Sequence, residues 1–349
     1  MSTQDTRPVP GAQVSGAPAP AEASRGARPA ARRVVAALLL IAGLLTFSYA
    51  GVSTYIATKL VYAPPKPLVG DPSQSGLTWA PIAFPARGDG VMLKGWVIPG
   101  VLPDGRLTDD RTLILVHGTR TNRTDPAAGL LKLSVALARQ GFAILAFDMR
   151  GTGQSPPAPL SLGYFEQRDV LGAVDFIHHG PWPYPELGRP RVIGGWGVSM
   201  GAATLLLAAA QEPAIRAVVS DCAYADIVPI LQREIPSQGG VPPLFTPGTL
   251  VAAFGIYGVN YFAVRPVDVI ARIAPRPILL IHGSVDNYIP PANMGELYAA
   301  ASAAPNAHVQ QWLVPGAKHA QSFNTLGVTY VRRVVDFFTA AFGPDQSAG

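Results

Sequence analysis

Hydrophobic positions along this chain follow two different periods. Short uncharged apolar runs predict buried strands at residues 112–116, 142–147, 192–196, 217–220 and 278–281. Between and after them, stretches with helical character occur at residues 126–139, 165–178, 202–211, 291–302 and 327–342. This alternation is typical of an α/β fold with a mainly parallel sheet and helices on both faces. Ligands of such a sheet collect at the carboxyl ends of its strands.

Three further strands extend the predicted sheet. Residues 79–86 and 91–98 are expected to form a hairpin, because Asp89-Gly90 between two apolar runs is a strong turn signal. Another strand, at residues 308–314, precedes the last helix.

Residues 222–275 interrupt the alternation of strands and helices. Five prolines there are expected to break any long helix: Pro229, Pro236, Pro242, Pro243 and Pro247. The segment also has more aromatic residues than a linker needs: Phe245, Phe254, Tyr257, Tyr261 and Phe262. We expect a small cap over the ligand site, with at least half of these aromatics only packing it onto the sheet.

An apolar segment near the N-terminus has the length of a membrane span. Residues 34–58 contain no charged residue and lie between Arg32-Arg33 and Lys59. About 20 helical residues cross a hydrocarbon core of about 30 Å, so this run predicts a single-pass transmembrane helix. Arginines before the run favour a cytoplasmic N-terminus, which places the catalytic domain outside the cytoplasm at the cell membrane. The alternative is a signal peptide cleaved near Ser48-Tyr49-Ala50, and a secreted protein.

The remaining segments are assigned around this span. Residues 1–33, rich in Pro, Ala, Gly and Ser, are expected to be a disordered tail, and residues 343–349 a disordered C-terminus. Residues 59–76 are predicted to form a stiff, proline-bearing linker that lifts the domain off the bilayer. Residues 77–342 form the predicted catalytic domain, with its cap at about residues 222–275.

Composition and charge narrow the possible partners. Hydrophobic residues make up 48% of the chain and charged residues 14%, as expected of a protein with a membrane segment. Of the net charge of +5, residues 1–33 carry +3, from five arginines against Asp5 and Glu22. Basic residues elsewhere are scattered, so no nucleic-acid partner is expected. The single cysteine, Cys222, excludes an intrachain disulfide and a thiolate metal cage.

A serine between two glycines follows the strand predicted at residues 192–196. In Gly197-Val198-Ser199-Met200-Gly201, a sharp strand-to-helix turn would hold Ser199 in a strained conformation, and Gly197 and Gly201 would permit the close packing that this turn needs. Ser199 is therefore the candidate nucleophile. The simpler interpretation is a glycine-rich turn with a surface serine.

A serine hydroxyl needs a base to remove its proton and a carboxylate to orient that base. Asp286 lies in the loop after the strand at residues 278–281, and His319 in the loop after the strand at residues 308–314. Asp221, which also ends a strand, is the alternative acid. The other histidines are expected at strand or helix ends: His282, His308, His178 and His179.

The oxyanion of a tetrahedral intermediate needs hydrogen-bond donors. The amide of Met200, directly after the nucleophile, and the amide of Thr119, in the turn His117-Gly118-Thr119, are the candidates. His117 itself is expected to be structural. No dinucleotide fingerprint, phosphate-binding loop or cluster of metal ligands occurs in the sequence, so we expect neither a cofactor nor a metal.

These motifs, in this order across residues 79–342, resemble the α/β-hydrolase family of serine hydrolases. The resemblance rests on His117-Gly118, Asp148-x-Arg150-Gly151-x-Gly153, Gly197-x-Ser199-x-Gly201, Asp286 and His319. Asp221-Cys222-Ala223-Tyr224, the short cap and His319-Ala320-Gln321-Ser322 are similar to bacterial membrane-anchored YqkD-like hydrolases and to BEM46-type hydrolases. The resemblance implies hydrolysis of esters, thioesters or amides without a cofactor.

We therefore expect a membrane-anchored serine hydrolase that cleaves a carboxylic ester, a thioester or a lipid-like acyl bond of a small molecule through an acyl-enzyme. A serine peptidase or acyltransferase on the same triad, and a non-catalytic anchored ligand-binding protein, are the alternatives. An apolar cap near a membrane favours acyl chains as substrates. The sequence does not indicate the oligomeric state.

Overall fold

The computed structural model describes residues 1, 3–4, 8, 11, 16 and 27–343, which divide into two units, residues 1–48 and 49–349. Helix α1 (Ala27–Val61) contributes to both units. It begins before the predicted span, so residues 27–33, expected to be disordered, are helical. Most of the rest of the predicted tail and residues 344–349 lie outside the described residues. The helix is long and apolar enough to cross a membrane, a test that a signal sequence also passes.

The second unit is built on an eight-stranded sheet in the order β1-β2-β6-β5-β7-β8-β9-β10. Its strands are β1 (Ala80–Pro85), β2 (Met92–Ile98), β5 (Arg111–Val116), β6 (Ala143–Asp148), β7 (Val192–Val198), β8 (Ile215–Asp221), β9 (Ile278–Gly283) and β10 (Val309–Val314). The pairs β1·β2 and β2·β6 are antiparallel and all other pairs are parallel, so the predicted α/β fold class is confirmed. A separate short ribbon, which the sequence did not predict, pairs β3 (Gly100–Val101) with β4 (Leu107–Thr108).

Helices cover both faces of the sheet because its strands are apolar on both sides. In β5, Ile114 and Val116 belong to one buried cluster, and Leu113 and Leu115 to the other. The first cluster includes side chains of α3 (Gln167–His179), α4 (Met200–Ala209) and α7 (Ala292–Ser302). The second includes side chains of α2 (Leu130–Ala138) and α9 (Val328–Phe342), and the short α8 (Ser322–Leu326) precedes α9.

The insertion between β8 and β9 contains two helices of 13 residues each, α5 (Ile227–Gly239) and α6 (Phe245–Tyr257). Pro242 and Pro243 lie between these helices, so the segment contains no single long helix, as expected, while the other three prolines fall within α5 and α6. Pro229 and Pro247 lie in first turns, where a missing amide hydrogen costs no intrahelical bond. Pro236 lies inside α5, one turn before the helix ends. Three short 3₁₀ turns complete the insertion: η3 (Tyr261–Ala263), η4 (Pro266–Asp268) and η5 (Ile270–Ile273).

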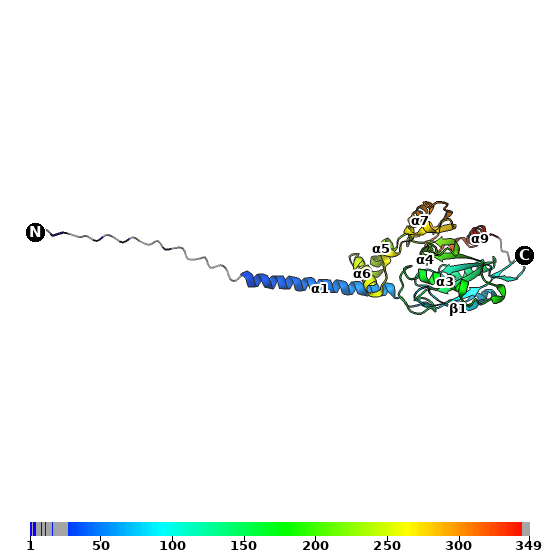
Figure 1. Cartoon of the computed structure of the whole chain (residues 1–349), viewed down its shortest axis with the longest axis horizontal. Helices are drawn as coiled ribbons and strands as arrows, with labels where there is room; N and C mark the ends of the chain where they lie inside the picture. Colours follow the sequence, from blue (N-terminus) through cyan, green and yellow to red (C-terminus); the bar gives the residue numbers. More distant parts are fainter. Residues whose placement is uncertain (2, 5–7, 9–10, 12–15, 17–26, 344–349) are drawn as a thin grey trace. The chain divides into compact units, whose positions relative to one another are not determined.

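The C-terminal end of α1 packs against α6, as the sequence did not predict (Figure 1). Ala57 and Val61 are completely buried. The Tyr49 hydroxyl donates to the Leu244 carbonyl at 2.9 Å and accepts from the Gly248 amide at 3.0 Å. A Cβ at Gly248 would lie 2.4 Å from Ser53 Oγ and 2.7 Å from the Tyr49 hydroxyl, so a larger residue there would have to displace these two side chains.

The segment after α1 is held against the second unit. Asn122 Nδ2 donates to the Lys66 and Pro67 carbonyls, and the Val69 amide donates to Thr124 Oγ1. Residues 59–76, predicted as a spacer, therefore begin inside a packed helix and continue as a strap along the surface of the unit.

Candidate active site

Ser199 occupies the turn between β7 and α4. Its backbone dihedrals, φ 55° and ψ −122°, fall in a region that non-glycine residues rarely adopt. A Cβ at Gly197 would lie 2.5 Å from the Gly201 carbonyl oxygen, and one at Gly201 would lie 2.3 Å from the carbonyl oxygens of Val116 and His117. Both glycines are required sterically, as expected for a sharp strand-to-helix turn.

The structure brings His319 and Asp286 to this serine from two other loops. His319 follows β10, and its Nε2 lies 2.9 Å from Ser199 Oγ. Its Nδ1 lies 2.7 Å from Oδ2 of Asp286, which follows β9. Because the carboxylate only accepts, Nδ1 carries the proton and Nε2 is left to accept the proton of the serine hydroxyl.

The Asp286 carboxylate is buried and surrounded by donors. Its Oδ1 accepts the amides of Tyr288 at 2.9 Å and Ile289 at 2.8 Å. Burial alone would raise the pKa of Asp286, but hydrogen bonds from His282 and His319 outweigh it, so the pKa lies well below its usual range. The group stays ionised and can stabilise a charged His319.

Asp221, the alternative acid, has other partners. Its carboxylate accepts hydrogen bonds from Ser322 Oγ at 2.9 Å and from the Tyr330 hydroxyl at 2.8 Å. Burial raises the pKa of Asp221. Asp221 therefore joins the end of β8 to α8 and α9, and the partner of His319 is Asp286.

Two other histidines have structural contacts. His117 is buried, with Nδ1 2.7 Å from the Gly118 carbonyl and Nε2 accepting the Met149 amide, and burial lowers its pKa. His282 Nε2 lies 2.8 Å from the Ile289 carbonyl oxygen and 3.4 Å from Oδ2 of Asp286, so the imidazole packs beside the carboxylate. The sequence placed His282 at a strand end but gave no signal of this contact.

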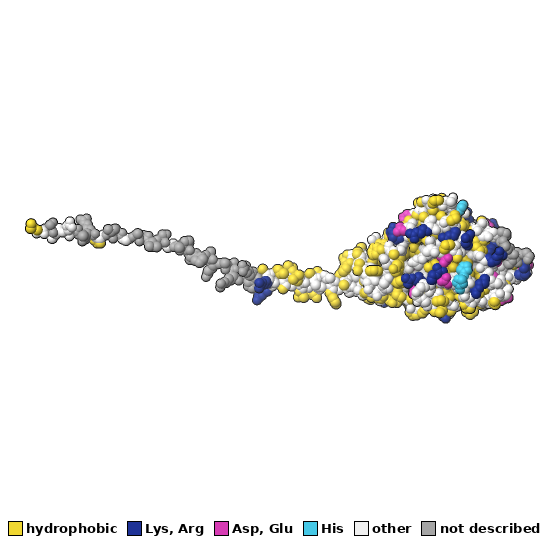
Figure 2. All heavy atoms as spheres, in the orientation of Figure 1, with side chains coloured by type: hydrophobic (Ala, Val, Ile, Leu, Met, Phe, Trp, Pro, Cys, Tyr) yellow, Lys and Arg dark blue, Asp and Glu magenta, His cyan; other side chains and the backbone are white. Residues whose placement is uncertain are grey.

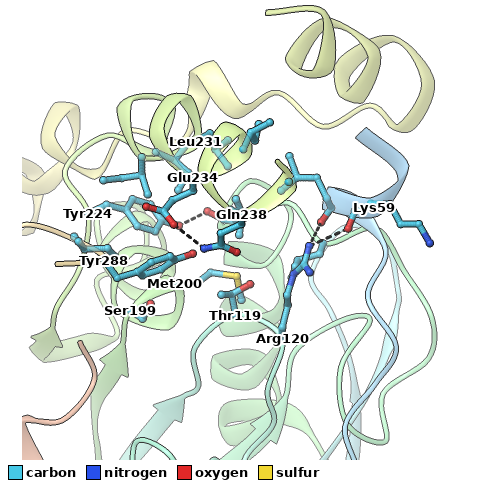
Figure 3. Close-up of a pocket in the computed structure, with 18 of the residues that line it drawn as sticks. Lys59, Thr119, Arg120, Ser199, Met200, Tyr224, Leu231, Glu234, Gln238 and Tyr288 are labelled. Atoms are coloured by element: carbon cyan, nitrogen blue, oxygen red, sulfur yellow. Dashed lines mark hydrogen bonds between the residues drawn. The ribbon is translucent and has the colours of Figure 1, made fainter. Parts of the chain in front are cut away.

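Thr119 and Met200, the candidate oxyanion donors, line the same pocket as Ser199 (Figure 3). Met200 is the first residue of α4, where helix amides have no intrahelical acceptor. A Cβ at Gly118 would lie 3.6 Å from Ser199 Cβ, which places the Thr119 turn beside the nucleophile. The Thr119 hydroxyl is buried without a hydrogen-bond partner.

The pocket has a volume of about 300 Å³ and a mainly apolar lining. In Figure 3, Leu231, Glu234 and Gln238 of α5 lie across from Ser199, with Glu234 accepting from Gln238 Nε2 at 2.6 Å. The end of α1 contributes Ile56, Lys59 and Leu60 to the lining. Sequence reasoning treated these three as part of the span or linker. The spacing of Tyr49, Ser53, Ala57 and Val61 at every fourth position is the signal that could have indicated a packed helix face.

One group of described residues meets a metal-ligand distance criterion, and it overlaps the triad. Ligand atoms of Cys222, Asp286 and His319 lie within 4.8 Å of one another. Burial, with the nearby carboxylates of Asp221 and Asp286, raises the pKa of the Cys222 thiol well above its usual value. A protonated thiol is a weak ligand, so the donor set fits a hydrogen-bonded triad better than a metal centre.

Comparison with known proteins shows the fold and the proteins that this chain is similar to. Residues 111–249 match the α/β-hydrolase fold family model. YfhR of Escherichia coli (strain K12) is 28% identical over 83% of this chain and 90% of its own length, and YqkD of Bacillus subtilis (strain 168) is 28% identical over 65% and 70%. The structure of the Pyrococcus furiosus esterase Pf2001 matches with a TM-score of 0.64 at 23% identity, over 81% of this chain and 99% of that one. The chain therefore has the α/β-hydrolase fold.

Proposed function

We propose that the protein is a membrane-anchored serine hydrolase that cleaves carboxylic esters through an acyl-enzyme. The observation that carries the proposal is the unbroken hydrogen-bond chain from Asp286 through His319 to Ser199 at one end of an apolar pocket. The esterase among the similar structures supports ester chemistry at the level of the fold. Thioesters and lipid-like acyl bonds belong to the same proposal.

The proposed reaction accounts for each proton. As Ser199 Oγ attacks the carbonyl carbon, His319 Nε2 takes the serine proton and Asp286 stabilises the resulting imidazolium. The amides of Met200 and Thr119 donate to the oxyanion. His319 then gives its proton to the leaving alkoxide, an alcohol departs, and the acyl group remains on Ser199. A water molecule, deprotonated by His319, attacks this ester, and the acid leaves with Ser199 reprotonated.

A fluorophosphonate probe tests the nucleophile directly. We expect the full-length protein to form an adduct that mass spectrometry maps to Ser199, and Ser199→Ala to abolish the adduct and lower kcat by up to about a millionfold. Ser73→Ala, which removes an exposed serine, should leave both unchanged.

Other outcomes would change the assignment. A Ser199→Ala protein with wild-type turnover would contradict the proposal. A folded wild-type protein that is never labelled would favour the non-catalytic binding protein. Hydrolysis of peptide amides without hydrolysis of matched esters would move the assignment to a peptidase, and acyl transfer to an added alcohol in preference to water would move it to an acyltransferase.

Helix α1 is proposed as the single-pass anchor, with the N-terminus in the cytoplasm and the catalytic unit on the other side. Its apolar run follows Arg32-Arg33, and its end is built into the catalytic unit, where Ala57 and Val61 are buried. We expect the intact mass of the protein in its native membrane to include the tail, and protease added to sealed cells to reach the catalytic unit. A mature protein starting at Gly51 would show that the helix is a cleaved signal.

A further inference from the structure

Helix α6 presents an apolar face that no described part of the catalytic unit covers. Its outward positions carry large exposed side chains, with Val251 67% exposed and Phe254 58% exposed. Others of this kind lie on or next to the helix: Leu244, Ile256 and Phe262. In Figure 2, hydrophobic atoms gather over the part of the unit where Figure 1 labels α6, and charged side chains lie over much of the remaining visible surface.

The same segment lacks charge altogether. No charged residue occurs between Glu234 and Arg265, although this stretch forms exposed surface. Soluble surfaces rarely combine a large apolar patch with a complete absence of charge, and such a patch marks an interaction surface. The absence of charge means that a protein partner would have no ion pair to make here, whereas a lipid layer needs none.

The place where α6 meets α1 indicates what covers the patch. Counted from Val34, directly after Arg33, about 20 residues of helix are needed to cross about 30 Å of hydrocarbon, which ends the crossing near Ser53. Helix α6 contacts α1 at this level: Tyr49 bonds Leu244 and Gly248, and Tyr49 stacks on the Phe245 ring at 5.3 Å. Slightly later along α1, Thr58 Oγ1 lies 2.7 Å from the Tyr257 hydroxyl.

The pocket lies at the next turn of the same helix. Ile56 and Leu60 form part of its wall, and the exposed Lys59 and Arg120 lie at its side (Figure 3). Basic side chains directly beyond a span sit at the level of lipid phosphates. The pocket is therefore within one or two helical turns of the bilayer surface.

We propose that α6 docks into the interfacial layer of the bilayer that holds α1, and that the pocket takes its substrate from this membrane. The substrate class is a lipid-like amphiphile whose acyl chain enters the apolar pocket and whose ester carbonyl reaches Ser199. The inference rests on the proposed anchor and hydrolase function, and it adds where the substrate comes from.

The depth of α6 can be measured without any enzymatic activity. The full chain with Val251→Cys, labelled with an environment-sensitive fluorophore, is reconstituted in phosphatidylcholine vesicles that contain spin-labelled lipids. The matched control is Val328→Cys, because Val328 is 75% exposed at the start of α9. The native Cys222 is buried, so the wild-type protein serves as the blank.

We expect a blue-shifted emission and strong quenching by lipid at position 251, and neither at position 328. Equal quenching at the two positions, or none at 251, would overturn the docking of α6.

A second pair of variants tests the source of the substrate. Val251→Ser with Phe254→Ser removes apolar side chains from α6, and Leu313→Ser with Val328→Ser removes exposed apolar side chains elsewhere. Each protein is assayed on p-nitrophenyl palmitate held in phosphatidylcholine vesicles and on water-soluble p-nitrophenyl acetate.

The α6 variant should lose about tenfold or more on the vesicle-held ester while keeping its rate on the acetate, and the control should keep both. An equal loss on both esters, or no loss on either, would overturn membrane loading. If the wild-type protein hydrolyses neither ester, both the proposed membrane source of the substrate and the proposed ester hydrolase function fail. The docking of α6 is still decided by the lipid-quenching measurement.

Discussion

Asp286 shows how a single buried charge can organise the proposed chemistry. Two backbone amides hold one of its oxygens and His319 Nδ1 holds the other, so the carboxylate and the imidazole are fixed relative to each other. Because its pKa lies well below the usual range, this carboxylate stays ionised at neutral and mildly acidic pH. Neutralisation of Asp286 should therefore not be the cause of any loss of activity on mild acidification.

Replacing this carboxylate by an amide should leave the fold and remove the charge. In Asp286→Asn, the amide NH₂ can donate to His319 and favour the tautomer that cannot accept the serine proton. We expect kcat to fall by about ten thousandfold with little change in KM, measured by steady-state ester hydrolysis. The exposed Asp104→Asn should be silent. A loss smaller than about tenfold would remove Asp286 from the triad.

At the scale of elements, the turn around Ser199 depends on the contact of α4 with β5. A Cβ at Gly201 would meet the carbonyl oxygens of Val116 and His117, which are backbone atoms and cannot rotate away. We expect Gly201→Ala to destabilise the protein by at least about 2 kcal/mol and to abolish labelling by the probe, because the start of α4 or the Thr119 turn must shift.

Another glycine provides the comparison for this variant. Gly295 lies in α7 with nothing within 4 Å of its added Cβ. Gly295→Ala should raise stability by about 0.5–1 kcal/mol through its better helix propensity, with activity unchanged. Thermal unfolding of the two variants measures the expected loss of stability in Gly201→Ala and the expected gain in Gly295→Ala. Equal melting temperatures would contradict the predicted clash of a Cβ at position 201.

The elements differ in how well sequence could predict them. Strands β5 to β9 and the loops of Asp286 and His319 are encoded locally, by apolar runs and by residues that directly follow them, and they were found within a few positions. The packing of α1 on α6 was not predicted, because it joins residues far apart in the chain. Tyr49 and Gly248, for example, are separated by 199 positions. An apolar helix suits both a membrane and a packed protein interface. Hydrophobicity alone therefore could not distinguish the N-terminal part of α1 from the part that packs on α6.

At the scale of the whole molecule, one buried carboxylate outside the site should contribute to how the free energy of unfolding depends on pH. Burial raises the pKa of Asp109 to about 6, although the Trp182 indole donates to it at 2.6 Å. In the unfolded chain the group ionises near its ordinary value of 3.8. The folded state therefore holds a proton that the unfolded state has lost, and this group makes the protein less stable as pH rises from about 4 to about 6.

Asp109→Asn should remove this dependence and keep an oxygen for the indole. Relative to wild type, the variant is expected to be unchanged near pH 4 and more stable by up to about 3 kcal/mol above pH 6. Melting temperatures of both proteins between pH 4 and pH 7.5 give the difference. A difference that does not grow with pH would mean that Asp109 ionises normally in the fold.

Arg120 connects the end of helix α1, the proposed membrane anchor, with the turn that carries Thr119. Its Nη2 donates to the Lys59 carbonyl at 2.9 Å and to the Leu60 carbonyl at 3.3 Å, the free acceptors at the end of α1. The residue before it, Thr119, carries one of the two proposed oxyanion donors. The end of the proposed membrane helix and one proposed oxyanion donor are thus connected through Arg120, which makes both hydrogen bonds and directly follows Thr119. Because the same end of α1 also lines the pocket, a change in bilayer thickness that moves this helix is expected to change substrate binding and turnover together.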